Sequence, residues 1–447
     1  MKARGTSRRD FLRGAGALPF AGVALPFASV ALPLTGAALL GGCRSASRDE
    51  KAVRFWALGR EAEVVSQLLP DFQRVHPDVR IELQQFPWTA AHQKLLTAFA
   101  GDALPDVCQL GNTWIPELAA LGALAPLDRF LADSTAIRSD DYFPGIWDTN
   151  IVAGALHGIP WYVDTRLLYY RRDLLRQAGY DHPPQDWQEW SAMLAAIKQR
   201  VGRDRYAVLL PLNEFEPLLA LALQQQEPVL RDNGRWGNFR TDGFRRALQY
   251  YVDMFRNDWA PAVTNTEVSN VWYEFGRGLF SFYISGPWNI REFRRRLPLG
   301  VQDAWMTAPL PGPDGPGASI AGGSSLVIPR SSRHKEAAWR LVEYLSQPPV
   351  QARFHAITGN PPPRRSTWDI SQLASDVYAR AFRQQLELAR AVPKVAEWER
   401  IMDEMRLVSE RVVEGGLGVD AAPAVLDARV DVILEKRRWL LDRGALA

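Results

Sequence analysis

After about residue 50, the pattern of hydrophobic and polar positions predicts strands and helices in alternation. The apolar run 53–58 indicates a strand that ends at Gly59, and apolar residues at helical spacing predict a helix over 61–72. Alternating apolar and polar residues predict a second strand over 79–86. The pattern continues with a helix over 90–100, a short buried strand over 105–110 and a helix from near Thr113 that ends before Gly122. This alternation predicts an α/β fold with a parallel sheet and crossover helices.

A second α/β segment begins after residues 158–160. Its first strand is predicted over 161–170 and leads into a helix over 173–178. Residues 309–317 are rich in Pro and Gly and predict an exposed loop, whereas 374–440 are predicted to be mostly helical. Further strands are predicted at 279–284 and 324–328, and further helices at 187–198, 215–226, 243–256, 289–296 and 335–345.

The first 43 residues read as an export address. Ser7-Arg8-Arg9-Asp10-Phe11-Leu12-Arg13 resembles a twin-arginine signal, and an apolar stretch then leads to Leu40-Gly41-Gly42-Cys43, which resembles a lipobox. We therefore expect residues 1–42 to be a signal peptide, Cys43 to carry a lipid and 43–52 to be a tether. The protein would be exported to the periplasm or the outer face of the cell membrane and held there by its lipid anchor.

The alternative for this stretch is a permanent transmembrane helix, because it is nearly long enough to span a bilayer. Prolines at 19, 26 and 33 interrupt it, and each removes a backbone hydrogen-bond donor. Twin arginines before an apolar run, with small residues before a cysteine, are more typical of a processed signal.

Charge and cysteine content exclude several classes of protein. The net charge is +3, but residues 1–42 carry +4, so the remainder is near neutral and lacks the basic character of nucleic-acid-binding proteins. Once Cys43 is lipidated, Cys108 has no disulfide partner, and its predicted strand makes it a buried core residue. The six histidines are far apart and phosphate-binding loops are missing, so neither a metal nor another cofactor is expected.

Five segments in order resemble a family 1 extracellular solute-binding protein of the maltose/trehalose-binding type, which feeds an ABC importer. They are residues 105–128 (PDVCQLGNTWIPELAALGALAPLD), 158–173 (GIPWYVDTRLLYYRRD), 279–290 (LFSFYISGPWNI), 322–329 (GGSSLVIP) and 358–368 (TGNPPPRRSTW). The resemblance implies a two-lobed periplasmic-binding-protein fold (type II, maltose-binding-like) with a hinged cleft between the lobes. It also implies a monomer without enzymatic activity that delivers its ligand to the permease subunits.

The resemblance places one lobe at 51–160 plus 304–346 and the other at 161–303 plus 347–447. The hinges are expected near 161–164, 300–303 and 346–349. Closure of two lobes about such hinges is a common way to trap a ligand.

The candidate ligand-binding residues combine aromatic and polar side chains. Tyr162, Asp164 and Arg166 alternate along a predicted strand and so face one side, where a ring, an acid and a base suit a pyranose. A structural Asp–Arg pair is the alternative. Glu61, Trp88, Asn112 and Trp114 follow predicted strands, where open α/β sheets bind ligands. The resemblance adds Trp288 as a stacking residue and either Arg364 or Arg365, whereas Gly323 and Ser324 could offer backbone and hydroxyl groups to the ligand.

Each of these residues also has a structural explanation. Trp288 could pack in the core, Glu61 could favour a helix N-terminus, and Gly323 with Ser324 could simply turn the chain. The run Arg291, Arg294, Arg295 and Arg296 is interpreted as a solvated helix face.

The residue types favour a neutral sugar, such as a disaccharide or oligosaccharide α-glucoside. Two other functions stay open. The same fold could bind a polyamine, a phosphodiester or a metal chelate, or the chain could be a glycoside hydrolase with Glu61 and Asp164 as its two carboxylates.

Overall fold

The computed structural model describes residues 52–444 and residue 446. The predicted signal peptide, the lipidated Cys43 and nearly all of the predicted tether lie outside these residues. Among the described helices, none combines the length and apolar character needed to cross a membrane.

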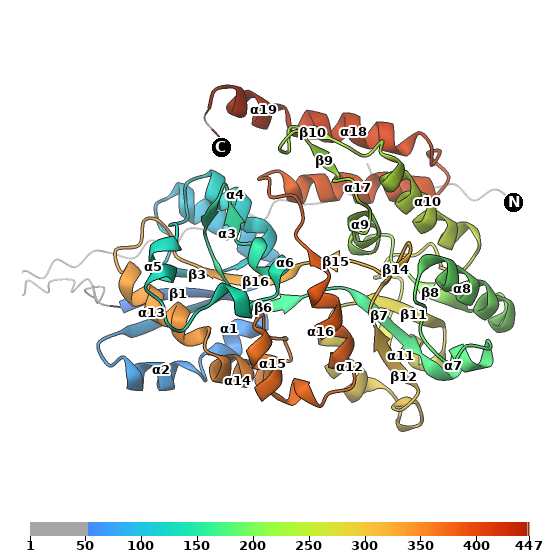
Figure 1. Cartoon of the computed structure of the whole chain (residues 1–447), viewed down its shortest axis with the longest axis horizontal. Helices are drawn as coiled ribbons and strands as arrows, with labels where there is room; N and C mark the ends of the chain where they lie inside the picture. Colours follow the sequence, from blue (N-terminus) through green and yellow to red (C-terminus); the bar gives the residue numbers. More distant parts are fainter. Residues whose placement is uncertain (1–51, 445, 447) are drawn as a thin grey trace, which may run out of the picture. The chain divides into compact units, whose positions relative to one another are not determined.

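A five-stranded sheet combines four strands from the first part of the chain with one later strand, β16 (Figure 1). Its strand order is β2 (Arg80–Phe86), β1 (Ala52–Leu58), β3 (Val107–Gly111), β16 (Gly322–Val327) and β6 (Ile159–Asp164). The β1 strand pairs in parallel with both β2 and β3, which confirms the predicted parallel arrangement. The β16 strand is antiparallel to both of its neighbours, so the complete sheet is mixed.

Helices cover both faces of this first sheet. Successive β1 residues point to opposite faces, so Phe55 packs with α1, α13 and α14, whereas Trp56 packs with α3 and α4. Cys108 is buried on the second face, as predicted, and burial raises the pKa of its thiol. These helices are α1 (Gly59–Val65), α2 (Leu69–Val75), α3 (Trp88–Ala100), α4 (Ile115–Ala120), α5 (Asp128–Ala132), α6 (Pro144–Asp148), α13 (Lys335–Leu345) and α14 (Pro348–Thr358).

The helix predicted over 61–72 is two helices, α1 and α2. Pro70 lies in the first turn of α2 and has no backbone N–H to continue the helical hydrogen bonds from α1. A turn over 66–68 therefore separates them, and the second helix runs further than predicted.

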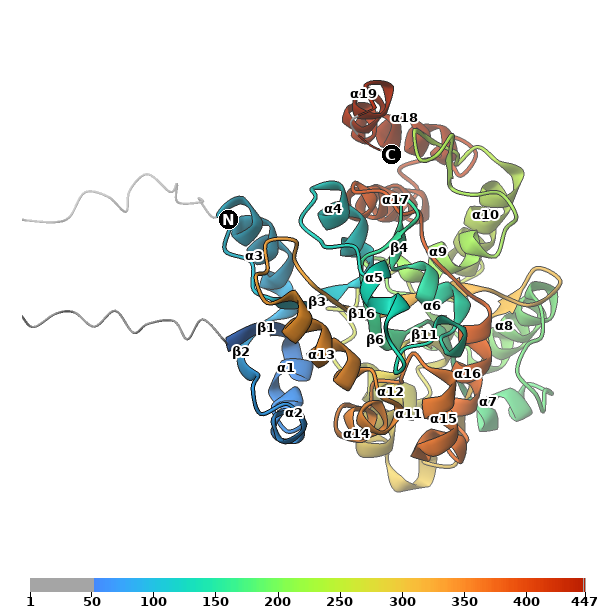
Figure 2. The same ribbon diagram turned by 60° about the vertical axis from the view of Figure 1, so that its left-hand side comes forward.

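A four-stranded sheet organises the second part, in the order β12 (Trp305–Ala308), β7 (Leu167–Arg171), β11 (Phe280–Ser285) and β8 (Tyr206–Leu209). In Figures 1 and 2, α10, α17 and α18 lie together above this sheet. Its helices are α7 (Arg172–Gln177), α8 (Trp187–Val201), α9 (Glu216–Leu223), α10 (Asp242–Arg256), α11 (Val271–Arg277), α12 (Trp288–Arg296), α15 (Arg365–Ile370), α16 (Ala379–Glu387), α17 (Trp398–Val413), α18 (Ala422–Ile433) and α19 (Glu435–Asp442). The predicted helical character of 374–440 is thus confirmed.

Short two-residue strands complete the description. The predicted exposed loop at 309–317 contains the hairpin β13 (Pro311–Gly312) and β14 (Gly315–Pro316), of which β13 is buried, so that expectation was wrong. The indole N–H of Trp187 donates to the Pro311 carbonyl at 3.2 Å, which ties the hairpin to α8. The other pairs are β4 (Ile151–Val152) with β5 (Ala155–Leu156), β9 (Leu230–Arg231) with β10 (Trp236–Gly237), and β15 (Ser319–Ile320) with β17 (Ala389–Arg390).

The predicted continuous strand over 161–170 is wrong. The structure has two strands there, and they belong to different sheets: β6 pairs with β16 in the first sheet, and β7 pairs with β11 and β12 in the second. The backbone of residues 159–164 forms hydrogen bonds within the first sheet, and the backbone of residues 167–171 forms them within the second. The chain therefore crosses between the sheets at Thr165 and Arg166.

Two of the expected lobe ranges differ from the observed packing. Residues 304–346 were assigned to the first lobe, yet β12 pairs with β7 in the second sheet, so the chain returns to the first sheet between β12 and β16. Residues after 347 were assigned to the second lobe, yet Phe354 of α14 stacks on Trp161 of β6, with ring centroids 4.5 Å apart.

Candidate ligand-binding site

A cavity of about 590 Å³ lies between segments that belong to the two sheets. We call it the interlobe cavity. The first sheet supplies the residues that follow β1, β2 and β3, together with the end of β6 and the start of β16. This agrees with the rule that open α/β sheets bind ligands beyond the carboxyl ends of their strands. The other wall comes from α9, the first residues of α12 and the start of α17.

Most of the predicted site residues line this cavity. They are Glu61, Trp88, Asn112, Trp114, Tyr162, Asp164, Trp288 and Gly323. These residues come from distant parts of the sequence, and the sheet topology brings them to one place. Their roles in binding remain predictions.

Arg166 holds two carboxylates at the wall of the cavity. Its Nη1 donates to Asp164 Oδ1 at 2.7 Å, and its Nη2 donates to Glu216 Oε1 at 2.5 Å. Its guanidinium also lies over the Trp288 ring, 4.8 Å from the centroid. Burial raises the pKa of the Asp164 carboxyl, and the Arg166 charge opposes that rise. Arg166 is therefore an ion-paired residue that joins the end of β6 to the start of α9.

Glu61 is held in place by two hydrogen bonds. Asn360 Nδ2 donates to Glu61 Oε1 at 2.7 Å, and the indole N–H of Trp88 donates to Oε2 at 3.4 Å. The carboxylate is buried, with 8% of the residue exposed, yet it lines the cavity. It can accept further hydrogen bonds from a ligand there.

The aromatic side chains differ in how far they reach into the cavity. Trp288 is 42% exposed, which rules out its being an ordinary core residue. A Cβ at Gly286 would lie 1.9 Å from the Trp288 ring, so the glycine makes room for this orientation. Trp88 and Trp114 pack edge to face with ring centroids 5.6 Å apart on the opposite wall.

Three of the predicted residues lie elsewhere. Arg364 is buried and donates to Asp141 Oδ2 and to the Ala136 and Ser346 carbonyls. Arg365 pairs with Glu387, so neither arginine of the adjacent pair lines the interlobe cavity. Ser324 donates its hydroxyl to the Leu110 carbonyl inside the first sheet. In each case intramolecular acceptors engage the side chain away from the cavity.

Several cavity residues were absent from the sequence prediction. Glu216 is the first residue of α9, which lies within the helix predicted over 215–226. Trp398 and Glu399 begin α17, and only tertiary packing brings this helix to the cavity. The missed lining residues are Gly111, Thr113, Val163, Phe215, Glu216, Leu219, Pro287, Ile320, Asn360, Val392, Trp398, Glu399 and Met402. Asn360 lies in segment 358–368, one of the five that resemble the family, but the sequence prediction takes only the two arginines of that segment.

Gly323 occupies a backbone conformation that other residues avoid. Its φ is +127°, and a Cβ there would lie 2.3 Å from the Tyr162 carbonyl oxygen on the neighbouring strand. We expect Gly323→Ala to lower the free energy of unfolding by more than about 1 kcal/mol. Chemical denaturation measures this effect. Gly300→Ala is the control, because nothing lies within 4 Å of the Cβ position at Gly300; an equal loss in both variants would contradict the prediction.

Glu214 lies just before α9, and burial raises the pKa of its carboxyl to about 7 from 4.5. The nearby Glu216 adds to the rise, whereas Arg166 and a hydrogen bond with Asn265 oppose it. The folded state thus binds this proton more tightly than the unfolded chain, so Glu214 lowers stability as pH rises from about 4.5 to about 7.

We therefore expect Glu214→Gln to raise the free energy of unfolding by about 2 kcal/mol at pH 8 and to have little effect near pH 4.5. Denaturation curves at the two pH values measure the difference. Glu414→Gln, at an exposed position after α17, is the control. A gain for Glu214→Gln that is the same at both pH values would show that the buried charge is not its cause.

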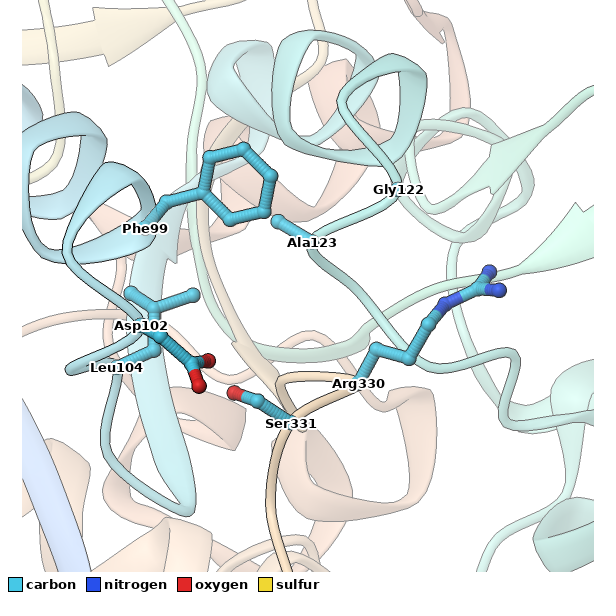
Figure 3. Close-up of a pocket in the computed structure, with 7 residues that line it drawn as sticks. All are labelled: Phe99, Asp102, Leu104, Gly122, Ala123, Arg330 and Ser331. Carbon is cyan, nitrogen blue, oxygen red and sulfur yellow. The ribbon is translucent and has the colours of Figure 1, made fainter.

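A smaller cavity of about 270 Å³ lies between the end of α3 and residues 330–331. Figure 3 shows Asp102 and Ser331 facing each other across it, whereas the Arg330 side chain extends away from them. Phe99 is its one aromatic residue, and none of the predicted site residues lines it. Its size and lining make it a weaker candidate for a sugar. In residues 52–444 and 446, no three His, Cys, Asp or Glu side chains are grouped so that they could hold a metal ion.

Comparison with known proteins decides the family. Residues 58–352 match the sequence profile described as bacterial extracellular solute-binding protein. The chain belongs to this family. The structure of the sugar-binding protein MalE from the phytopathogen Xanthomonas citri is 61% identical, covers 88% of this chain and 99% of that chain, and superposes with a TM-score of 0.86.

More distant relatives match the chain over most of their length. A solute-binding protein from Thermotoga lettingae, bound with α-D-tagatose, is 25% identical with a TM-score of 0.72, covering 86% of this chain and all of that chain. The diacetylchitobiose binding protein DasA of Streptomyces coelicolor is 22% identical over 367 residues, which are 80% of this chain and 84% of DasA. The fold is accordingly the two-lobed periplasmic-binding fold of the maltose-binding type. The family is one of substrate-binding proteins, not of enzymes.

Proposed function

We propose that this solute-binding protein captures a neutral sugar in the interlobe cavity and delivers it to an ABC importer. The observation that carries the proposal is the lining of the cavity, which combines aromatic faces with carboxylates and an amide on two opposing walls. The 61% identity to the MalE sugar-binding protein supports it. A volume of about 590 Å³ falls within the range of small-molecule sites and suits a disaccharide or short oligosaccharide, such as an α-glucoside.

The chemistry of the two walls explains how a sugar would be held. Trp288 offers a flat exposed face on which the C–H face of a pyranose can stack. Glu61 and Asp164 can accept hydrogen bonds from hydroxyl groups, and Asn112 adds an amide. Polar groups that pair with specific hydroxyls reject analogues lacking them, because the protein groups would then be left unpaired.

Closure would involve the chain crossings between the two sheets. We propose that the first lobe is built on β2-β1-β3-β16-β6 and the second on β12-β7-β11-β8, with one hinge at Thr165 and Arg166. Sugar binding at both walls would favour the closed arrangement, since a ligand shifts a conformational equilibrium toward the state that it binds better. The protein would act as a monomer that presents the closed form to the permease.

Calorimetric titration with maltose, trehalose, sucrose and longer oligosaccharides tests the proposal. At about 100 times its dissociation constant, the correct sugar should add about 2.7 kcal/mol to the free energy of unfolding. Spermidine and glycerophosphodiesters test the alternative of a charged ligand in the same fold. Absence of heat and of a melting shift with every sugar would overturn the proposal. Release of reducing ends from an oligosaccharide would instead indicate a glycoside hydrolase.

We also propose that the protein is exported through its twin-arginine signal and anchored by a lipid on Cys43. The sequence Leu40-Gly41-Gly42-Cys43 supports this. Cys43→Ser should move the protein from the membrane fraction to the soluble fraction, as cell fractionation and mass spectrometry of the N-terminus would measure. Unchanged membrane retention together with an uncut N-terminus would contradict cleavage and lipidation.

A further inference from the structure

A second groove, of about 500 Å³, shares Pro287 with the interlobe cavity. Trp288 lines the cavity, whereas the following turns of α12 place Arg291, Arg294 and Arg295 along the groove. We call it the arginine groove. Its opposite wall is formed by the end of α14, residues that follow it, and parts of α15 and α16. None of the residues selected from the sequence as ligand-binding lines it.

The arginines of α12 differ in their partners. Arg296 lies over the Trp272 ring, 4.2 Å from the centroid, and pairs with Glu292, and it does not line the groove. Arg294 pairs with Asp376 at 2.8 Å, and Arg295 is 3.9 Å from Glu292. Within the described part of the chain, Arg291 makes no hydrogen bond or ion pair, although its Cδ lies 3.9 Å from the Cβ position at Gly359.

The groove is thus positively charged, because the one carboxylate in its lining pairs with only one of its three arginines. Of its lining residues, Asp376 is the one carboxylate against three guanidinium groups. Burial lowers the pKa of His355, whose Nδ1 faces the Asn360 carbonyl, so this ring adds no charge near neutral pH. The balance of charge favours an anionic ligand of more than one negative charge.

The position of the arginines on α12 strengthens this argument. Like charges three and four residues apart on a helix repel each other, so Arg291 lies unfavourably beside Arg294 and Arg295, whose charges Asp376 and Glu292 offset only in part. The helix dipole favours basic residues in the last turn, which accounts for Arg294 and Arg295 but not for Arg291. Guanidinium groups bind phosphate and carboxylate oxygens through paired hydrogen bonds. Apolar side chains, including Ile290, Ile357 and Leu373, line the groove beside these exposed arginines.

We propose that the arginine groove is a second binding site, for a small polyvalent oxyanion such as a phosphorylated or polycarboxylate metabolite. It is separate from the sugar site and goes beyond the proposed function. The four arginines are exposed, which confirms the solvated helix face inferred from the sequence, and the proposal adds a ligand-binding role to it.

Titration calorimetry with inorganic pyrophosphate and with citrate, at low ionic strength, tests this site. We expect one bound anion per chain, with Arg291→Gln weakening the affinity about 10-fold and Arg291→Gln/Arg294→Gln abolishing detectable binding. Binding of pyrophosphate alone would indicate a phosphorylated ligand, and binding of citrate alone a polycarboxylate. Arg296→Gln is the matched control on the same helix and should keep the affinity within about 2-fold.

The two proposals can fail separately. Arg291→Gln removes no intramolecular partner among the described residues, so it should fold and keep its heat of sugar binding. Retained sugar binding with lost anion binding supports the second site. Absence of binding of both anions to the unaltered protein, or equal affinity in Arg291→Gln, Arg296→Gln and the unaltered protein, would overturn it whatever the outcome of the sugar titrations.

Discussion

Replacing Trp288 with alanine should weaken sugar binding roughly 30- to 1000-fold while leaving the melting temperature of the free protein nearly unchanged. Tryptophan side chains at the centre of a binding site typically contribute 2–4 kcal/mol, and each 1.4 kcal/mol is a factor of ten in affinity. The fold depends little on this ring because it is 42% exposed and lines the interlobe cavity. Calorimetric titration of the variant with the sugar identified for the unaltered protein measures the loss.

Trp439→Ala is the matched control for this experiment. Trp439 is 52% exposed on α19 and does not line the interlobe cavity, so its removal should leave sugar affinity within about 2-fold. Normal sugar affinity in Trp288→Ala would show that the cavity has been assigned wrongly, even though the family is established.

Replacing Arg166 with methionine should lower the free energy of unfolding by about 3–5 kcal/mol. Removing one partner of a buried ion pair leaves uncompensated charge, and here two carboxylates, Asp164 and Glu216, would lose the same cation. The side chain of Arg166 is only 15% exposed, so water cannot replace it fully. Denaturant unfolding of the sugar-free protein measures the loss.

A charge-neutral version of the same site provides the test of mechanism. The triple variant Arg166→Met/Asp164→Asn/Glu216→Gln should recover much of the lost stability, because no buried charge then lacks a partner. Arg138→Met is the surface control, since its pair with Asp140 is largely exposed and should contribute less than about 1 kcal/mol. If the triple variant is as unstable as Arg166→Met, packing of the arginine side chain rather than charge balance is responsible.

Local hydrophobic spacing predicts individual strands and helices of this chain, but not which distant segments they pack against. The strands over 52–58 and 80–86 and the helices over 187–201 and 335–345 agree with prediction, because hydrophobic spacing reports which side of an element is buried. The continuous strand predicted over 161–170 failed for the same reason: an apolar run shows that residues are buried but not in which sheet. The arginines at 364 and 365 failed because the sequence holds no record of Asp141 and Glu387, which pair with them.

The sequence by itself determined the α/β class and the family resemblance, and most of the site residues selected from it line the interlobe cavity, since these follow from local spacing and from short motifs. Only the tertiary structure decided that Arg166 also pairs with Glu216, that Asn360 and Trp398 join the cavity, and that three arginines of α12 line a second groove. The physical reason is that these contacts join segments between 50 and almost 300 residues apart, or depend on which face of a helix meets a distant neighbour. The packing of the two sheets and their helices, rather than the spacing within any one segment, brings such residues together.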